Sequence, residues 1–253
     1  MTAWTAPYRA RVAAWTAPLG SAGVAALAVV VWQVVSGMTF VVPAPAATVQ
    51  ALVRDLADTS FQHDLAVTCV AAFWAFVIGA MTGAVLGLAL GSSRRARLVF
   101  EPLVVALNGV PKIVLYPLLL PLLHLGMGSK IALGVLFAMF PVLINVATGV
   151  RAIPSVYWSL AKSLNAGRAQ TLLHVTLPAI RRPVLTGLRL AVSLALVGVV
   201  LAEFFATKRG LGRVVLQSYT AGDYPDMMAT ILLLVLVSFV LSLALWRLER
   251  SIR

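Results

Sequence analysis

Three polar side chains interrupt an otherwise apolar stretch near the middle of the chain. Glu101, Asn108 and Lys112 are seven and four residues apart, which places them on one face of a helix. Charged and amide groups are costly in an apolar environment, so this face is expected to border a polar cavity or a partner helix. Two roles are open for Lys112: contact with a polar ligand, or a structural role in which it neutralises an acidic neighbour or binds backbone carbonyls.

A further acidic residue, Glu203, lies near the end of another apolar stretch. It shares a helical face with Arg189 and Ser193. One role for Glu203 is a counter-ion for a basic residue such as Lys208 or Arg209, and another is part of a gate. The residues alone do not separate these two roles.

The chain lacks the residue patterns of catalysis and metal binding. Its three histidines, His63, His124 and His174, have no ligand spacing, and the single cysteine, Cys69, lies in an apolar run. No Ser/His/Asp or Cys/His arrangement and no phosphate-binding G-x-x-x-x-G-K-[ST] pattern occurs. We therefore expect no catalytic residue, no metal and no cofactor in this chain, so that any ATP used must be bound by another subunit.

The composition is that of a membrane protein. Of 253 residues, 61% are hydrophobic and 11% are charged, against about 45–50% apolar residues in a soluble domain. Apolar runs of about 20 residues recur, which is the length of a membrane-spanning helix, and they lack the alternation of barrel strands. The predicted fold class is an all-α integral membrane protein. The net charge of +12 is scattered over segment ends, which argues against nucleic acid as a partner.

Six apolar runs are long enough to be transmembrane helices. Short helices are also expected outside the spans, at residues 46–57 and 213–219. The whole chain, residues 1–253, is expected to form one transmembrane domain. The predicted spans are residues 21–40, 65–91, 99–123, 129–150, 183–205 and 227–246.

The basic residues predict the orientation in the membrane. They gather at residues 94–97, 151–182 and 247–253, and the positive-inside rule places these segments in the cytoplasm. Both termini are then cytoplasmic, and residues 41–64 and 206–226 form external loops.

Glycine and proline predict how two of the spans are built. In the second span, Gly79, Gly83, Gly87 and Gly91 recur every four residues, so that one face has no side chains and a neighbouring helix can approach closely. The third span contains four prolines, each of which removes a backbone donor and clashes with the preceding turn. This span should therefore be bent or broken, which makes it the leading candidate for lining a pathway. The prolines are Pro102, Pro111, Pro117 and Pro121.

A polar, basic segment, residues 152–182, separates the fourth and fifth spans. Tyr157, Ala161 and Leu164 recur at helical spacing and predict a short helix. Asn165 tolerates a left-handed backbone and Gly167 follows closely, which marks a turn.

A second short helix is predicted after this turn. It is expected to end at Pro178, and Pro183 suits the first turn of the next span. A helix-turn-helix of this size has too little apolar surface to be stable alone in water. It is expected to rest on another protein or on anionic lipid at the membrane surface.

This segment resembles the cytoplasmic coupling loop of bacterial ABC importer permeases. The pattern of that loop is Glu-Ala-Ala, three residues, Gly, nine residues, Ile, any residue, Leu-Pro. Leu177 and Pro178 match its end, whereas Ser159 and Asn165 replace the usual glutamate and glycine, and Val175 stands at the isoleucine. Other stretches look like the nitrate, sulfonate and taurine branch of that family, namely residues 110–117, 140–145, 187–191, 199–203 and 210–212.

The resemblance implies a type I ABC importer permease fold and a set of partners. These are a second copy of the permease, two ATPase subunits that bind ATP and Mg, a solute-binding protein outside, and the lipid of the bacterial inner membrane. The residues implied to contact the ATPase are Ser159, Ala161, Leu164, Asn165, Ala166 and Gly167. The candidate residues of the translocation pathway are Asn108, Lys112, Asn145 and Glu203.

The predicted function is therefore that of a permease subunit, and not of an enzyme, in an ATP-driven importer for a small solute. An anion such as a sulfonate, taurine or nitrate is one substrate class, and a vitamin-precursor heterocycle is another. A rival interpretation is an ion-coupled secondary transporter, in which Lys112 on the broken span would serve the coupled substrate. A membrane-embedded enzyme or a scaffold is a further rival, which the missing catalytic residues disfavour.

Overall fold

The computed structural model describes residues 23–206 and 208–251, and all regular structure in this part of the chain is helical. The fold class predicted from the sequence is thus confirmed. The elements are Gly23–Met38, α2 (Pro45–Ala57), α3 (Thr59–Ser92), α4 (Arg94–Gly109), the 3-10 helix η1 (Lys112–Leu115), α5 (Tyr116–Leu123), α6 (Met127–Arg151), α7 (Ser155–Ser163), α8 (Arg168–Thr171), the π-helical turn η2 (Leu172–Thr176), α9 (Leu177–Ala206), α10 (Leu211–Ala221) and α11 (Tyr224–Ser251).

Four helices are long and apolar enough to cross a membrane. They are α3, α6, the continuous helix Arg168–Phe205 and the helix Tyr224–Arg247, and the bent pair of α4 with η1 and α5 adds a fifth. The sequence predicts six spans. The described part of the first one, Gly23–Met38, is shorter than a span, and its predicted start at residue 21 lies outside the described residues, as do Arg9 and Arg11.

Several helices begin well before their apolar runs. The helix α3 starts at Thr59, six residues ahead of the predicted span, because the carboxylate of Asp58 accepts hydrogen bonds from the N–H groups of Ser60 and Phe61. This N-cap satisfies two of the backbone donors that a helix start leaves free. A prediction from hydrophobicity alone therefore underestimates the length of this helix.

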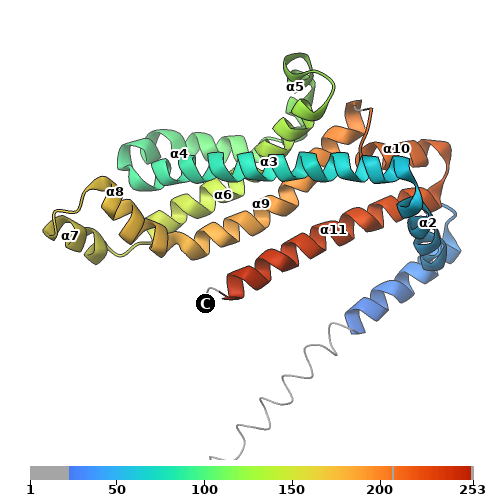
Figure 1. Cartoon of the computed structure of the whole chain (residues 1–253), viewed down its shortest axis with the longest axis horizontal. Coiled ribbons are helices and arrows are strands. Elements are labelled where there is room, and N and C mark those ends of the chain that lie inside the picture. The colour runs from blue at the N-terminus through green and yellow to red at the C-terminus, as the bar shows by residue number, and fades with distance from the viewer. Residues whose placement is uncertain (1–22, 207, 252–253) are drawn as a thin grey trace, which may run out of the picture.

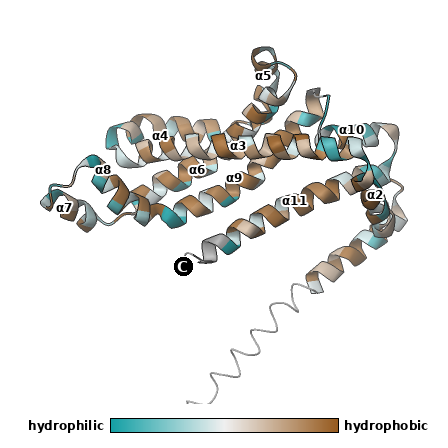
Figure 2. Ribbon diagram, viewed as in Figure 1, coloured by the Kyte–Doolittle hydropathy of each residue, from teal (hydrophilic) through white to brown (hydrophobic). Residues whose placement is uncertain are grey.

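The core lies where α3, α6 and α9 pack against one another. Their shared cluster of buried side chains is dominated by small and β-branched residues, which allow close approach of the backbones. The three helices run side by side along the long axis, with α11 beside α9 (Figure 1). Hydrophobic residues cover most of their length, and hydrophilic ones gather toward the ends (Figure 2). Such a distribution suits helices that cross a bilayer.

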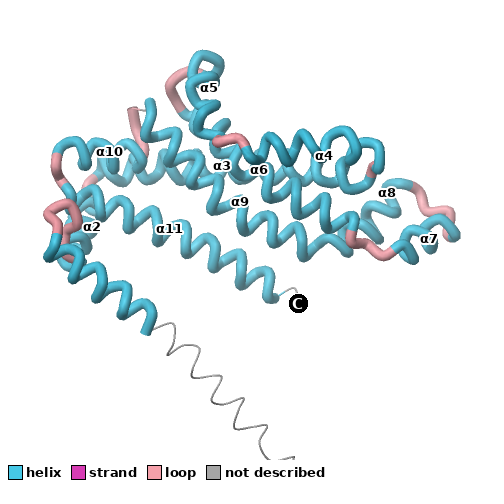
Figure 3. The backbone as a smooth tube through the Cα atoms, turned by 180° about the vertical axis from the view of Figure 1, so that it is seen from behind, coloured by secondary structure: helices cyan, strands magenta, loops and turns pink. Residues whose placement is uncertain are grey.

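The third predicted span is broken, as its prolines predict. After α4 ends at Gly109, the chain turns through 92° into η1 and α5. Pro111 precedes η1 and has no N–H to continue the ladder of α4. The loop between α4 and α5 and the departure of α5 from the bundle are visible from behind in Figure 3.

The polar segment forms a helical hairpin at one end of the bundle, opposite the end that carries α2 and α10 (Figure 1). Its two arms are α7 and α8. The prediction that Pro178 ends the second arm is wrong, because a single helix continues from Arg168 to Phe205. The π-helical turn Leu172–Thr176 directly before Pro178 changes the hydrogen-bond register there, and this irregular turn accommodates the proline ring within the helix. Pro183 consequently lies inside α9 and not at its start.

The end of the bundle that carries α2 is held by ionic contacts. Arg54 of α2 forms an ion pair with Asp226 at the start of α11 and contacts its neighbour Asp55. Partial burial raises the pKa of the Asp55 carboxyl, and the adjacent Arg54 guanidinium acts in the opposite direction. These contacts attach α2 to the bundle.

Candidate functional site

A buried ion pair joins α6 to α9 close to the end of the bundle that carries α10. Lys130 Nζ lies 3.1 Å from Glu203 Oε1, and the two side chains are 3% and 0% exposed. Thr68 Oγ1 of α3 lies 3.0 Å from both carboxylate oxygens of Glu203. Lys130 also donates to the backbone oxygen of Arg209 at 2.5 Å. A buried carboxylate needs such a set of partners, since its desolvation is otherwise too costly.

The loop after α9 closes over this ion pair. Backbone N–H groups donate from Gly212 to Glu203 Oε2 (2.9 Å) and from Leu211 to Thr68 Oγ1 (2.9 Å). The N–H of Gly210 donates to Asp64 Oδ1 at 2.8 Å. A Cβ at Gly210 would lie 2.0 Å from Glu203 Oε1, and the φ of this residue is +121°, so only glycine fits there.

Basic residues flank the second buried acid. The carboxylate of Asp64 lies 3.7 Å from Arg209 and 4.0 Å from Arg213. We call Asp64, Thr68, Lys130, Glu203 and the loop residues 209–212 the outer cluster. It fixes α3, α6, α9 and the start of α10 to one another.

The structure adds a counter-ion of Glu203 that the sequence analysis did not name. Lys208 and Arg209 were given as examples of a cation for Glu203, and the ion pair in the buried cluster is made by Lys130. Lys130 is distant in the sequence, and no local pattern links it to Glu203. The available signal was a lysine in the first turn of an apolar span, which is unusual enough to require a buried partner.

The three residues of the predicted polar stripe, Glu101, Asn108 and Lys112, do not share one partner: Lys112 contacts Asn108, and Glu101 contacts another helix. Lys112 Nζ donates to the backbone oxygen and to Oδ1 of Asn108 at 3.2 and 3.3 Å, and lies 4.8 Å from the ring centroid of Phe140. Because α4 ends at Gly109, the backbone carbonyl of Asn108 has no N–H partner within the helix. The structural role considered for Lys112 thus describes its contacts here, and the lysine lies at the break itself.

Glu101 and Asn145 have other partners. Glu101 Oε1 accepts from Arg151 at 2.6 Å, which links α4 to the end of α6. Asn145 Nδ2 donates to the carbonyl of Pro141 in its own helix at 2.8 Å. Of the four candidate pathway residues, the structure brings Asn108 and Lys112 into contact, while Asn145 and Glu203 bond elsewhere.

The four glycines of α3 face α6. A Cβ on Gly79 would lie 2.7 Å from Ala138 Cβ, and one on Gly83 would lie 2.5 Å from the carbonyl oxygen of Met139. The contact continues along the helices, with 2.7 Å at Gly87 and 2.7 Å at Gly91. No side chain fits between these backbones without a shift of the helices.

The hairpin ends in a well-defined turn. Asn165 has a φ of +50°, in the left-handed region, and the N–H of Ala166 donates to the carbonyl of Ala161 at 2.9 Å. This is the bond that closes a helix in a Schellman motif. Leu164 stands at the tip with 71% of its surface exposed, whereas Ala161 is 7% exposed and packs inside the hairpin.

Among residues 23–206 and 208–251, no group of three or more His, Cys, Asp or Glu side chains could hold a metal ion. The hydrogen bonds and ion pairs above join helices to one another.

The family follows from comparison with known proteins. Residues 79–253 match the model of the binding-protein-dependent transport system inner membrane component, and the chain belongs to this family. It is therefore a multi-pass permease of the inner membrane and a transport subunit of a binding-protein-dependent ABC importer. ATP is hydrolysed by partner subunits in this family, and an ATPase and a binding protein are implied as partners. The ion-coupled rival is thereby wrong.

Relatives support this assignment over nearly the whole chain. An ABC transporter permease protein of Haemophilus influenzae is 32% identical over 88% of this chain and 92% of its own length. The taurine transport system permease protein TauC of Escherichia coli is 29% identical over 94% and 92%. The formylaminopyrimidine transport permease protein ThiX of Halalkalibacterium halodurans is 27% identical over 87% and 89%.

The fold has been observed before in a transporter. A chain of the MetNI methionine ABC transporter, in an inward-facing conformation, superposes with a TM-score of 0.63 at 20% identity, covering 81% of this chain and 97% of that one. The type I importer permease fold predicted from the sequence is thus confirmed.

Proposed function

We propose that this chain is the permease of an importer for a small anion, with residues 1–253 as one transmembrane domain. Two copies form the pathway, and two ATPase subunits that bind ATP and Mg lie on the cytoplasmic side. The hairpin is the element through which they act. With the hairpin in the cytoplasm, α2 and α10 face outward, and both termini are cytoplasmic.

The hairpin carries the proposal for coupling. It projects past the ends of α3 and α6 (Figure 1), and the side chain of Leu164 at its tip is exposed. The second arm is continuous with α9. A displacement of the tip would therefore move α9 as a body.

The contact with the ATPase is proposed for part of the predicted set. Leu164, Asn165 and Gly167 are exposed at the turn, as is Ser159 on α7. Ala161 instead shapes the hairpin from within, and Ala166 is half-buried. The large exposed leucine, rather than a charge at Ser159, is the expected anchor.

A tip substitution tests this role. Leu164→Glu places a charge on the exposed anchor and removes no buried contact, so the fold should persist while association with the ATPase and uptake fall at least tenfold. Val156→Glu is the matched control, since Val156 is 64% exposed on the same helix but lies away from the turn. Equal loss in both variants, or full uptake with Leu164→Glu, would refute coupling through the tip.

The second copy is proposed to cover the face of α4 that carries Phe100 and Leu103. None of the sixteen residues of this helix is buried, although both of these side chains are large and apolar and more than half exposed. Cross-linking of single-cysteine variants on this helix in membranes would show the contact between copies. The Cys69→Ser background removes the native thiol for this experiment.

An anionic substrate is supported by Lys112. Its ammonium group is half-buried at the break between α4 and α5 and has no carboxylate partner within 4.0 Å in the described part of the chain. The resemblance to taurine permeases agrees with this class. The relative for formylaminopyrimidine favours the alternative, a heterocyclic vitamin precursor.

Uptake by Lys112 variants separates the two substrate classes. If the ammonium contacts an anion, Lys112→Met should lower uptake about tenfold, the value of one charge-assisted hydrogen bond, and Lys112→Arg should retain most of it. ATPase association should be unchanged in both. Equal uptake of the anion by Lys112→Met and the wild type would contradict the anion contact, and binding of heterocycles alone by the partner binding protein would favour the alternative.

A further inference from the structure

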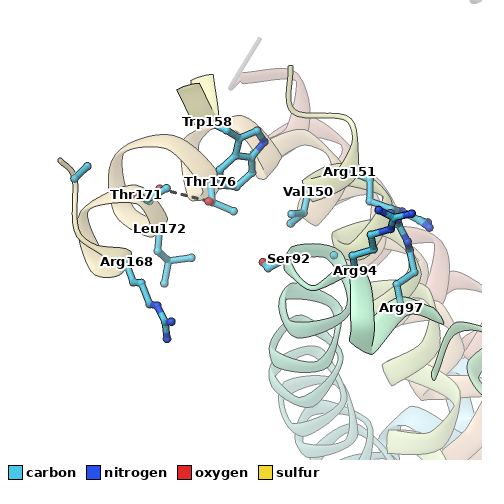
Figure 4. A pocket seen from close by; sticks show the side chains of 12 residues that line it. Ser92, Arg94, Arg97, Val150, Arg151, Trp158, Arg168, Thr171, Leu172 and Thr176 are labelled. Atoms are coloured by element: carbon cyan, nitrogen blue, oxygen red, sulfur yellow. Dashed lines mark hydrogen bonds between the residues drawn. The ribbon is translucent and has the colours of Figure 1, made fainter. Parts of the chain in front are cut away.

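A basic cavity of about 690 Å³ lies between the hairpin and the ends of the long helices. It reaches the hairpin turn at Ala166, and no part of the proposed transport pathway uses it. In Figure 4, Arg94, Arg97 and Arg151 gather on one side of the cavity. Arg168, at the start of α8, lies on the opposite side, and Ser92 lies between the two sides. Four arginines thus line one concave site, with Arg168 across it from the other three.

Most of this positive charge has no carboxylate partner among the described residues. Arg151 is paired with Glu101 at 2.6 Å. For Arg94, Arg97 and Arg168, no carboxylate oxygen of the described residues lies within 4.0 Å. Guanidinium groups bind phosphate through paired N–H donors, so an oxyanion ligand matches the site.

The start of α4 adds further donors. This sixteen-residue helix begins at Arg94, and the hydroxyl of Ser93 accepts from the N–H of Ala96. The first N–H groups of a helix have no partner within it, and its N-terminus carries partial positive charge. Backbone and side chains at this corner therefore favour the same kind of ligand.

The position of the cavity indicates where such a ligand comes from. Three long helices end or begin at it, α3 at Ser92, α4 at Arg94 and α6 at Arg151. This is the level at which apolar spans meet the aqueous phase, where lipid phosphates lie. Arg97 also borders a shallow groove of about 580 Å³ that follows α4 between Leu98 and Ala106 and is largely apolar.

We propose that this cavity binds the phosphate of an anionic phospholipid, whose acyl chain lies along the groove on α4. The phosphate is held by Arg94 and Arg97, and Arg168 adds positive charge on the opposite side of the cavity. A free phosphate ion would satisfy the same donors but would leave the adjacent groove unoccupied.

Lipid binding by the full chain, purified in detergent, tests the site. Native mass spectrometry would measure binding of phosphatidylglycerol, with phosphatidylethanolamine and inorganic phosphate as parallel probes. The triple variant Arg94→Gln, Arg97→Gln, Arg168→Gln is compared with a control that removes three other basic side chains near the same end. The control is Lys162→Gln, Arg181→Gln, Arg182→Gln, whose side chains are exposed and do not line the cavity.

General attraction of anionic lipid to basic residues lowers binding in both variants. A built site predicts a further loss in the cavity triple alone, at least tenfold beyond the control. Should the triple fail to fold, Arg94→Lys with Arg97→Lys keeps the charge and removes the paired donors, and it should still bind less than the wild type.

Equal losses in the two triples would overturn the proposal, as would equal binding of phosphatidylethanolamine. If inorganic phosphate displaces the lipid and binds with higher affinity, the ligand is a soluble anion and the lipid assignment is wrong. If the cavity triple loses ATPase association with lipid binding unchanged, the cavity receives an acidic segment of that partner. Failure of coupling through Leu164 would leave the lipid result unaffected.

Discussion

Replacing Gly83 by alanine should separate the two most closely packed helices of the core. A Cβ at Gly83 would lie 2.5 Å from the carbonyl oxygen of Met139, 3.0 Å from Val142 Cβ and 3.2 Å from the backbone N of Leu143. Ordinary contact begins at 3.4 Å, so α3 and α6 must move apart by about 0.9 Å. All three neighbours are backbone or Cβ atoms, so no flexible side chain can absorb the shift.

Two effects of opposite sign determine the size of the loss. Overpacking of this kind costs about 1–3 kcal/mol. Alanine in place of glycine within a helix contributes up to about 1 kcal/mol of stabilisation. Lipid is as apolar as the helix face, so no hydrophobic gain offsets the lost contacts. A net decrease in the free energy of unfolding of about 1–2 kcal/mol is expected.

Gly37→Ala is the control. Gly37 is helical, and nothing lies within 4 Å of the position of a Cβ there, so this change adds a methyl group without a clash. Unfolding of the purified chain in mixed micelles by denaturant, followed by circular dichroism, gives the two free energies. If Gly83→Ala were no less stable than Gly37→Ala, the argument from close packing would be refuted. Gly87→Ala, with a clash of 2.7 Å, should behave like Gly83→Ala.

Other contacts give further expectations for the same unfolding assay. Lys130→Met should lower the free energy of unfolding by about 3–5 kcal/mol, because it leaves the buried carboxylate of Glu203 without its cation. Adding Glu203→Met should recover part of this loss, and a double variant whose loss is the sum of the two single losses would contradict the pairing. Glu101→Gln should cost about 1 kcal/mol or less, since its ion pair with Arg151 is about one-third exposed, and a loss as large as that of Lys130→Met would show that exposure does not control these pairs. Asn165→Ala should destabilise the hairpin by about 1 kcal/mol while Asn165→Gly is tolerated, measured as protease cleavage within residues 155–171; equal cleavage of the two variants would contradict the left-handed turn.

The parts of the fold that could be predicted are those decided by local physics. A run of about 20 apolar residues has few alternatives to a membrane helix. The break after Gly109 follows from the chemistry of Pro111, and the left-handed residue at Asn165 follows from its side chain. Each of these depends on neighbours a few positions away.

The features that escaped prediction depend on partners that the sequence does not bring together. Lys130 and Glu203 are 73 positions apart, and their pairing requires the relative register of α6 and α9. Ala161 and Leu164 share a helical edge in the sequence, yet Ala161 is buried within α7 and Leu164, which caps that helix, is exposed. Pro178 failed as a stop signal because the π-helical turn before it accommodates the ring.

The helix from Arg168 to Phe205 connects the two ends of this molecule. It begins in the hairpin, beside the basic cavity, and ends with Glu203 in the outer cluster. The π-helical turn is the irregular segment within it, and Thr176 Oγ1 donates to the carbonyl of Thr171 there at 3.4 Å. The remainder is α-helical, with Pro183 inside it, and its packing against α3 and α6 limits bending. Under the proposed coupling, motion at Leu164 would reach the outer cluster as a rotation or tilt of α9, and the buried ion pair would keep α6 moving with it.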